Sequence, residues 1–250
     1  MRKDQFQIHA AVEDHHWWFT ARRNIIIDHI AKHHPRAKFV AEIGCGTGGN
    51  LKELESRGYD TIGVDGDGDA VALANNRIKA DVLEGDFEVC LAPYWERIDV
   101  VLLADVLEHV ADDQGMLRRV WDKIEPGTLV VITVPALQSL WSVHDEVLGH
   151  YRRYNVDGLG KLVRAMPHAR VVQLSYFNFF LFPPVYLVRS LKRLLPGSGA
   201  EETASDLELH HPTVNRILAF IFEMERPWLR RGGKFPVGSS ALAIISKEQS

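Results

Sequence analysis

Cysteine, surplus positive charge and long apolar segments are all scarce in this chain. Only two cysteines, Cys45 and Cys90, occur in 250 residues, so a disulfide framework is not expected and a reducing cytoplasm fits best. The net charge of -4 lacks the basic surplus typical of proteins that bind nucleic acids. Residues 1–16 contain no apolar core of the kind that a signal peptide needs. These absences predict a cytoplasmic protein with one domain, residues 1–250, and a small molecule as its partner.

Metal-binding motifs are also missing, although the chain has 12 histidines. Several histidines are adjacent, as in His15/His16, His33/His34 and His210/His211. Adjacent side chains point away from one another on a helix or a strand, and no H-x-x-x-H motif with a carboxylate occurs. We therefore expect no metal ion.

Short β-rich segments alternate with helical ones along the first half of the chain. The β-rich segments are 37–44, 59–65, 80–86, 97–105 and 128–135. Such alternation predicts βαβ units around a parallel sheet, and therefore an α/β fold. Residues 100–104, VVLLA, are apolar throughout, which is typical of a strand covered by helices on both faces of the sheet.

A glycine-rich loop follows the first predicted strand, in VAEIGCGTGGN at 40–50. Glycines between a strand and a helix let a ligand approach the backbone closely, near the helix N-terminus. Gly44, Gly46 and Gly48 would line that approach, with Cys45 between them. The same loop also reads as G-x-G-x-x-G, the fingerprint of dinucleotide-binding proteins, so the glycines alone do not name the ligand.

Acidic residues near the strand ends narrow the choice of ligand. Glu42 lies two residues before the first loop glycine and could receive an ammonium group. Asp65, followed by Gly66, ends the second strand, where a carboxylate can accept both hydroxyls of a ribose. Asp86 ends the third strand beside Phe87, a pair suited to an adenine ring and its amino group. Together these residues outline an adenosine that carries an amino acid.

With these motifs the chain resembles the class I S-adenosylmethionine-dependent methyltransferases. The resemblance rests on VAEIGCGTGG, IGVDGD, LEGDF and IDVVLLADVLEHV, which stand in the expected order. It implies a Rossmann-like, seven-stranded, mostly parallel sheet with an antiparallel last strand at 237–247. It also implies S-adenosylmethionine as cofactor. The residues then expected at the cofactor are Glu42, Gly44, Cys45, Gly46, Gly48, Asp65, Gly66, Asp86, Phe87 and Asp105, although Asp105 could instead cap a helix.

Two flanking segments resemble a bacterial subgroup of small-molecule methyltransferases from glycan, lipid or secondary-metabolite pathways. They are EDHHWWFTARRNII at 13–26 and HDEVLGHYRRYNVDGL at 144–159. This likeness divides the domain into an N-terminal helical lid at 1–37, a core at 38–178 and 236–250, and a helical insertion at 179–235. The chain has ADVLEHV where methyltransferases of nucleobase amino groups usually carry D/N-P-P-Y/F, which disfavours nucleic-acid substrates.

The lid is predicted to be a helix that carries Trp17, Trp18 and Arg22 over the cofactor and the acceptor, because aromatic side chains exclude water. Packing of the same helix against the core is an equal alternative. Both roles are compatible with one helix.

The acceptor is expected beyond the fifth strand. If a hydroxyl is methylated, a base must take its proton, and the candidates are His144, Asp145, His150 and Tyr154. Arg152 and Arg153 could bind an acidic or phosphorylated acceptor. In the alternative, Asp145 forms a salt bridge with one of these arginines and His150 caps a turn. His109 is expected to pack or to form a hydrogen bond within its turn.

The predicted activity is methyl transfer from S-adenosylmethionine to a small-molecule or lipid- or glycan-linked acceptor, with O-methylation favoured. Two alternatives remain open, a cofactor-binding scaffold without turnover and a nicotinamide-dependent oxidoreductase. The second needs neither Glu42 nor the pair Asp86 and Phe87.

Residues 182–195, FPPVYLVRSLKRLL, predict a basic amphipathic helix. Val185, Val188, Leu191 and Leu195 form one apolar stripe, and Arg189, Lys192 and Arg193 fall largely elsewhere. Such a helix could lie peripherally at the inner face of a membrane. It could equally form a wall of the acceptor site or the face of a homodimer. A polar loop is predicted to follow, at 195–206.

Overall fold

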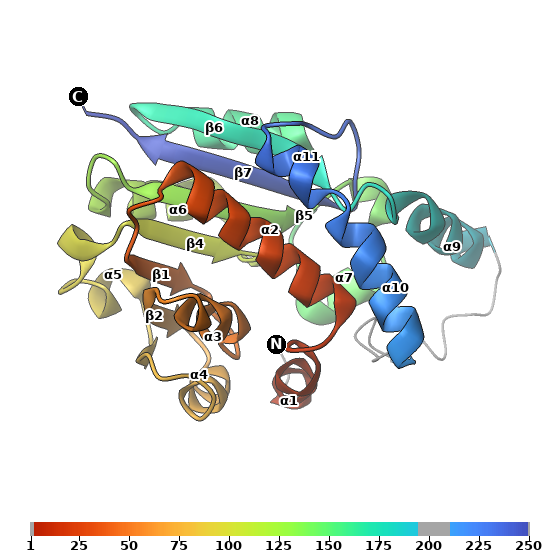
Figure 1. The fold of residues 1–250 in the computed structure, drawn as a ribbon, viewed down its shortest axis with the longest axis horizontal. Coiled ribbons are helices and arrows are strands. Elements are labelled where there is room, and N and C mark those ends of the chain that lie inside the picture. The colour runs from red at the N-terminus through yellow and green to blue at the C-terminus, as the bar shows by residue number, and fades with distance from the viewer. Residues whose placement is uncertain (1–2, 195–210, 250) are drawn as a thin grey trace.

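The computed structural model describes residues 3–194 and 211–249. Its centre is a seven-stranded sheet in the order β3-β2-β1-β4-β5-β7-β6 (Figure 1). Strand β7 alone runs in the opposite direction to the other strands, so that it is antiparallel to both β5 and β6. The strands are β1 (Phe39–Ile43), β2 (Asp60–Asp65), β3 (Val82–Glu84), β4 (Val100–Ala104), β5 (Leu129–Pro135), β6 (Ala169–Phe177) and β7 (Ser240–Lys247). The predicted α/β class, the seven strands and the antiparallel last strand are thus confirmed.

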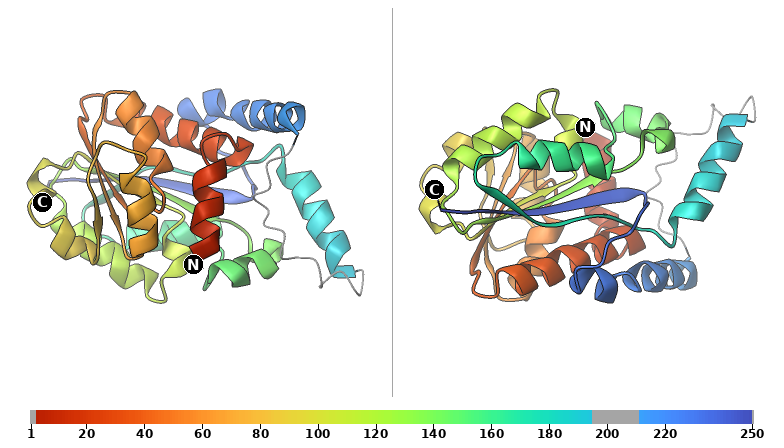
Figure 2. Two further views of the ribbon diagram at one scale, coloured as in Figure 1. Left: turned by 90° about the horizontal axis from the view of Figure 1, so that it is seen from below. Right: turned by 90° about the horizontal axis from the view of Figure 1, so that it is seen from above.

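Helices cover both faces of the sheet, as the apolar strands require (Figure 2). One face carries α2 (Trp17–His33), α3 (Gly49–Ser56), α10 (Pro212–Glu223) and α11 (Arg226–Arg230). The other carries α5 (Phe87–Cys90), α6 (Asp113–Lys123) and α8 (Val156–Arg164). The remaining helices are α1 (Lys3–Val12), α4 (Gly68–Asn75), α7 (Val143–Leu148), α9 (Phe182–Leu194) and the short 3-10 turns η1 (Trp95–Arg97), η2 (Leu107–His109) and η3 (Gln138–Leu140).

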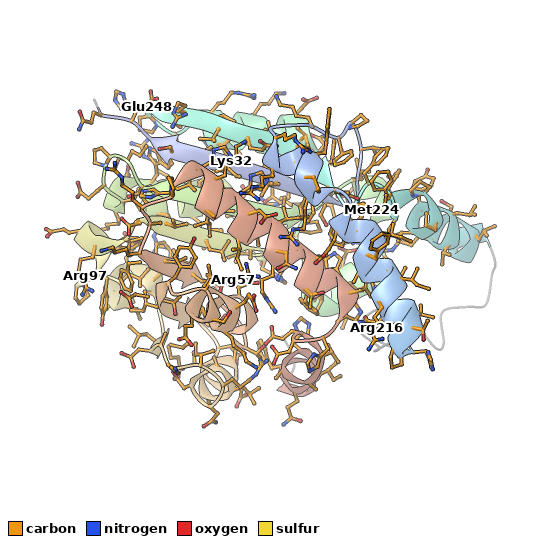
Figure 3. All side chains as sticks on the ribbon, viewed as in Figure 1. Lys32, Arg57, Arg97, Arg216, Met224 and Glu248 are labelled. Atoms are coloured by element: carbon orange, nitrogen blue, oxygen red, sulfur yellow. The ribbon has the colours of Figure 1, made fainter. Side chains whose placement is uncertain are left out.

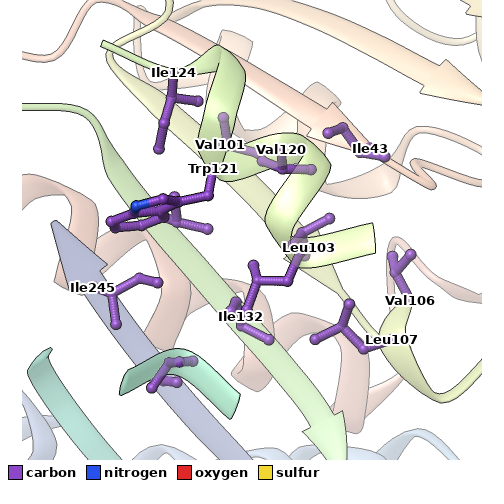
Figure 4. Packing of buried hydrophobic residues seen from close by; sticks show 14 of the residues in the cluster. Ile43, Val101, Leu103, Val106, Leu107, Val120, Trp121, Ile124, Ile132 and Ile245 are labelled. Atoms are coloured by element: carbon purple, nitrogen blue, oxygen red, sulfur yellow. The ribbon is translucent and has the colours of Figure 1, made fainter. Parts of the chain in front are cut away.

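The larger core lies between the sheet and the α6–α8 face (Figure 4). Trp121 is fully buried there, and its indole N–H donates to the Pro167 carbonyl at 2.8 Å. Ile132 and Ile245, from β5 and β7, contribute to the same cluster. Charged side chains such as Lys32, Arg57 and Glu248 lie on the outside (Figure 3). This core fixes the strands whose ends carry the site.

The N-terminal segment forms two helices, so a lid over the whole of 1–37 is too simple. Ile25, Ile26 and Ile30 of α2 are buried against the sheet and belong to the core. Only α1 and the first turns of α2 reach the open edge of the sheet, beside α4. The segment therefore combines both expected roles, since α2 packs against the core along its length while its first turns and α1 also line the cavity.

The predicted helical insertion is present as α9, α10 and α11. Helix α9 lies at one end of the molecule, apart from both helical layers (Figure 2). Leu195 and the predicted loop at 195–206 fall outside the described residues. Among the helices that are described, none is long and apolar enough to cross a membrane.

Candidate active site

A cavity of about 1070 Å³ opens at the carboxyl ends of the parallel strands. Open α/β sheets bind ligands at this edge, where the strand order reverses between β1 and β4. Its walls come from the loop after β1, from α1 and α2, from η2 and α7, and from α9. Sites for a single ligand measure roughly 300 to 1000 Å³. The cavity therefore has room for two small molecules side by side.

The glycine loop forms the floor at one end of this cavity. Gly44 and Gly46 have φ of 70° and 54°, a left-handed conformation that favours glycine. A side chain at Gly44 would also meet Val106 at 2.7 Å, whereas the position of Gly46 faces open space. The Gly46 amide donates to Asp65 Oδ2 at 2.8 Å. The carboxylate thus fixes the loop with its backbone exposed to a ligand.

Glu42 is a buried carboxylate at the end of β1, only 1% exposed. Its Oε1 accepts a hydrogen bond from Asn50 Nδ2 at 2.6 Å, and its Oε2 has no hydrogen-bond partner among the described residues. Burial raises the pKa of Glu42 to about 8. An unsatisfied buried carboxylate is costly, so this atom is ready to receive a positively charged group.

Arg22 reaches into the same part of the cavity from α2. Its guanidinium forms an ion pair with Asp105 and lies over the Trp18 ring, 4.5 Å from the ring centroid. Burial lowers the pKa of Arg22 to about 10, which leaves it charged at neutral pH. Asp105 therefore faces the cavity and does not cap a helix. A ligand that carries both an ammonium and a carboxylate would find Glu42 and Arg22 together.

Asp86 and Phe87 line an adjoining hollow of about 540 Å³, which shares Asp65 and Gly66 with the main cavity. Phe87 is buried, and the Arg119 guanidinium lies 4.7 Å from its ring centroid. Asp86 begins α5 by accepting from the Glu88 amide at 2.9 Å, and it pairs with Arg119 at 2.6 Å. These bonds hold the pKa of Asp86 below its ordinary value. The pair is thus placed as expected, but its carboxylate already has a partner.

The other two loop residues, Cys45 and Gly48, lie in different surroundings. Cys45 packs inward against Leu51 and Val82, and burial raises the pKa of its thiol well above the usual range. Gly48 is the N-cap of α3, and a side chain there would meet Ala74 at 3.2 Å. Cys45 nevertheless lines the cavity beside Gly44 and Gly46, whereas Gly48 shapes the loop from behind.

Helix α1 is fastened to the glycine loop by Glu13 and Arg77, a contact that the sequence did not suggest. Thr47 Oγ1 donates to Glu13 Oε1 at 2.6 Å, and Arg77 pairs with both Glu13 and Asp14. Arg77 also donates to the Thr47 carbonyl at 2.9 Å. Helix α1 is consequently fastened to the glycine loop by polar contacts.

Helix α10 holds the lid from the opposite side. The Trp17 amide donates to Asn215 Oδ1 at 2.9 Å, and the Trp17 ring packs edge-on against Phe222. Trp17, Trp18 and Arg22 all line the cavity, as expected for a lid.

A buried ionic network supports the far end of the cavity. Asp145 is fully buried and accepts from His150 Nδ1 at 2.8 Å and from Arg153 Nε at 2.7 Å. Burial alone would raise the pKa of Asp145, but these two partners outweigh it and hold the pKa well below its ordinary value. Asp145 also accepts from the Ser142 amide at 2.9 Å, which completes the capping box of α7. The residue is therefore structural.

Three of the predicted acceptor residues do not line the cavity, so their expected roles need correction. Asp145 is enclosed by its own partners. Tyr154 donates to Asp113 Oδ2 at 2.6 Å, and burial together with this carboxylate raises its pKa far above the ordinary value. Arg152 pairs with Asp113 at 2.8 Å. Tyr154 cannot serve as a base at neutral pH from this position, and Arg152 does not reach an acceptor.

His144, His150 and Arg153 do line the cavity, and His109 joins them. His109 packs as expected, with its ring centroid 4.6 Å from that of His150, and it does so at the cavity wall. The motif LEHV contains this residue, but the direction of its side chain depends on the turn η2. Glu108 and His9 also line the cavity and had no distinctive pattern in the sequence.

Comparison with known proteins adds a family and a set of relatives. A family model described as "Methyltransferase domain" matches residues 15–199. The ubiquinone biosynthesis O-methyltransferase of Azorhizobium caulinodans is 33% identical over 99 residues, which are 38% of this chain and 39% of that protein. The enzyme of the same name from Ruegeria pomeroyi is 37% identical over 95 residues, 36% and 38% of the two chains. The chain thus matches about two fifths of the length of these relatives.

Solved structures show the same fold over most of the chain. A methyltransferase from Archaeoglobus fulgidus, described as SAM-dependent, superposes with a TM-score of 0.53 at 19% identity, covering 90% of this chain and 94% of the other. The plantazolicin methyltransferase BamL superposes with a TM-score of 0.58 at 13% identity, covering 92% and 86%.

Proposed function

Because the chain belongs to the methyltransferase-domain family, we propose that it transfers a methyl group from S-adenosylmethionine to a hydroxyl of a small or lipid- or glycan-linked acceptor. One observation carries the proposal. A single cavity runs from Glu42 and Asp65 at one end to His144 and His150 at the other. Donor and acceptor can therefore share one space from which the lid excludes water.

The residues at the first end fit this cofactor. Glu42 offers a buried, unsatisfied carboxylate oxygen for the ammonium, and the Arg22 guanidinium lies beside it for the carboxylate. Each oxygen of Asp65 accepts one backbone amide, from Gly46 at 2.8 Å and from Asp67 at 3.0 Å, and keeps capacity for a ribose hydroxyl. Phe87 borders the space for the adenine ring.

His144 is the base that we assign at the acceptor end. It lies on α7 and lines the cavity at the acceptor end. When bound, S-adenosylmethionine supplies its sulfonium methyl to the acceptor oxygen and leaves as S-adenosylhomocysteine, while the hydroxyl proton passes to His144. The cavity wall otherwise contributes position and a dry environment.

An apolar acceptor is favoured by the lining near α9. Leu181, Val185, Val188 and Leu218 line this part of the cavity. The curated relatives are named as O-methyltransferases of ubiquinone biosynthesis, which supports oxygen as the acceptor atom. The histidine-lined wall has the groups that an O-methylation needs.

A screen for S-adenosylhomocysteine formation tests the proposal. Purified protein is incubated with S-adenosylmethionine and with panels of phenols, aliphatic alcohols, amines and lipid-linked hydroxyls, and product masses are recorded. We expect turnover with a hydroxyl compound and a product one methylene heavier. Turnover with amines alone would refute O-methylation. Binding of S-adenosylmethionine without turnover of any acceptor would favour a cofactor-binding scaffold. Binding of NAD in place of S-adenosylmethionine would favour a nicotinamide-dependent oxidoreductase.

We also propose that α9 brings a cytoplasmic protein to the inner face of a membrane, where a lipid-linked acceptor would be reached. Tyr186, Leu187 and Leu191 on α9 are exposed, as are Ile217 and Phe220 on α10. Because Val185 and Val188 also line the cavity, the helix serves as an acceptor-site wall at the same time. Arg189 lines the cavity too and donates to the Leu140 carbonyl, so we leave it out of the basic residues that are proposed to meet the membrane.

Cosedimentation with anionic and neutral liposomes tests this contact. Lys192→Gln and Arg193→Gln together should weaken binding to anionic liposomes roughly thirtyfold, at about 1 kcal/mol for each basic group. Wild-type protein that fails to sediment with anionic liposomes at low salt would refute the membrane contact. Dimers in solution that dissociate on Leu187→Glu would assign the surface to a second copy of the chain.

A further inference from the structure

Three side chains with metal-ligating atoms converge on the acceptor side of the cavity. Glu108 and His109 are neighbours in η2, and His150 follows α7, about 40 residues further along the chain. One ligand atom from each of the three lies within 4.8 Å of the other two. All three residues line the cavity. The sequence does not reveal this group, since its members come from two separate turns.

The orientation of His150 is fixed by a carboxylate behind it. Asp145 Oδ1 accepts from Arg153 Nε and lies 2.8 Å from His150 Nδ1, so Nδ1 is the ring nitrogen that donates to the carboxylate. This hydrogen bond leaves Nε2 as the ring nitrogen that can ligate a metal ion. A carboxylate that holds the second ring nitrogen is the usual support for a metal-ligating histidine. Arg153, at 2.7 Å from Asp145 Oδ1, keeps the carboxylate in place.

Glu108 supplies an independent indication of a ligand. The residue is only 1% exposed, and its Oε2 has no hydrogen-bond partner among the residues that the structure describes. A buried carboxylate oxygen without a partner is costly, and a bound cation would satisfy it.

We propose that Glu108, His109 and His150 bind a divalent transition-metal ion on the acceptor side of the cavity. Two imidazoles and one carboxylate favour Zn²⁺, Fe²⁺ or Mn²⁺ over Mg²⁺ or Ca²⁺, which prefer oxygen ligands alone. Ligand atoms at about 2.1 Å from a tetrahedral ion lie roughly 3.4 Å from one another. The three ligand atoms must therefore move about an ångström closer together to bind an ion. The exposed ring of His109 has the freedom to make this movement. The proposal reverses the sequence-based expectation of no metal.

The site would act on the acceptor, a role that rests on the proposed function. Three protein ligands leave coordination positions open, as in catalytic metal sites. A cation there favours loss of the proton from an acceptor hydroxyl and orients its oxygen. The proton still passes to His144. Phenols, and above all hydroxyls with a second oxygen next to them, would suit the open positions best.

Titration of metal-free protein tests the site without any assay of activity. The full-length protein is treated with a chelator and titrated with Co²⁺, whose visible absorption reports ligation, and with Zn²⁺ by calorimetry. We expect one ion per chain. Glu108→Gln and His109→Gln should each weaken binding at least about tenfold, as should loss of the supporting carboxylate in Asp145→Asn.

His15→Gln is the matched control, because His15 is an exposed histidine that does not line the cavity. It should bind the metal as wild type does. Since Glu108 and Asp145 are buried, their variants are checked by circular dichroism, and His109→Gln at an exposed position remains informative if they fail to fold. Absence of a one-to-one complex, or His109→Gln binding Co²⁺ as tightly as His15→Gln, would overturn the proposal.

The same samples separate this proposal from the proposed function. S-adenosylhomocysteine affinity is measured by calorimetry with and without the metal, and Glu108→Gln should change it less than about twofold. Metal bound without methylation of any hydroxyl would retain the site and refute the function. Undiminished methylation by protein that binds no metal would retain the function and refute the site.

Discussion

The two ends of the cavity each contain a buried carboxylate, and the two carboxylates are in opposite states. Within the described part of the chain, Glu42 at the cofactor end has only the side-chain amide of Asn50 as its hydrogen-bond partner, and burial raises its pKa to about 8. Asp145 at the acceptor end is bonded to His150 and Arg153, and its pKa is held well below the ordinary value. Partner groups, more than burial, decide the difference.

The different partners of Glu42 and Asp145 show which of the two carboxylates is available to bind a ligand. Asp145 has no need of an external cation, because its charge is already compensated within the protein. Glu42 gains a compensating charge only when an ammonium arrives. Glu42 is therefore built to be completed by a ligand, as Glu108 is in the proposed metal site, whereas Asp145 is a finished support that holds His150 in place.

The largest effect is expected from His144→Ala, which breaks the acceptor end alone. Loss of a general base should lower kcat about a hundredfold to ten-thousandfold, while S-adenosylhomocysteine affinity stays within about twofold. Steady-state kinetics and calorimetry measure the two quantities. His33→Ala, at the far end of α2, is the control and should leave both unchanged. Equal kcat for the two variants would remove His144 from the mechanism.

Asp65→Ala breaks the cofactor end. Two hydrogen bonds to the ribose, at about 1 to 2 kcal/mol each, give an expected loss of roughly 2 to 4 kcal/mol, or about thirtyfold to a thousandfold in affinity. Calorimetry with S-adenosylhomocysteine measures the change. Asp60→Ala, at the exposed opposite end of β2, is the control. Unchanged affinity in folded Asp65→Ala protein would refute the ribose assignment.

The pH dependence of cofactor binding sharpens the contrast between the two carboxylates. Below about pH 8 Glu42 is protonated in the free protein and must release its proton to receive an ammonium. Affinity for S-adenosylhomocysteine should therefore rise with pH by up to about tenfold per unit between pH 6 and 8, and then level off. Glu42→Gln should bind more weakly and show no such rise. A wild-type profile as flat as that of Glu42→Gln would contradict the assignment.

The smallest effect is expected from Arg77→Gln, which loosens the lid at the cofactor end. Loss of the pairs with Glu13 and Asp14 should lower the free energy of unfolding by about 1 kcal/mol, and the Tm by roughly 2 to 4 °C. Arg118→Gln removes an exposed pair with Asp122 and should change stability by less than about 0.5 kcal/mol. Thermal unfolding that does not distinguish the two variants would show that the lid contacts contribute little.

Much of the cofactor end could be predicted because its residues follow one another along a strand, a loop and a helix. In a parallel sheet the carboxyl ends of β1 and β2 lie at one edge, so Glu42, Gly46 and Asp65 had to meet there. The acceptor end could be predicted only as a region. Of its candidates, His144 and His150 reach the cavity, whereas Tyr154 and Arg152 turn to Asp113.

By itself, the sequence determined the α/β fold, its order of strands and helices, and the position of the glycine loop, because each depends on local periodicity and on chain direction. Tertiary structure alone decided which side chains face one another across turns. It placed Glu108 and His109 opposite His150, fastened Glu13 to Thr47, and enclosed Asp145 between its partners. The physical reason is that the direction of a side chain leaving a turn depends on what the neighbouring elements pack against, and no spacing along the chain records that.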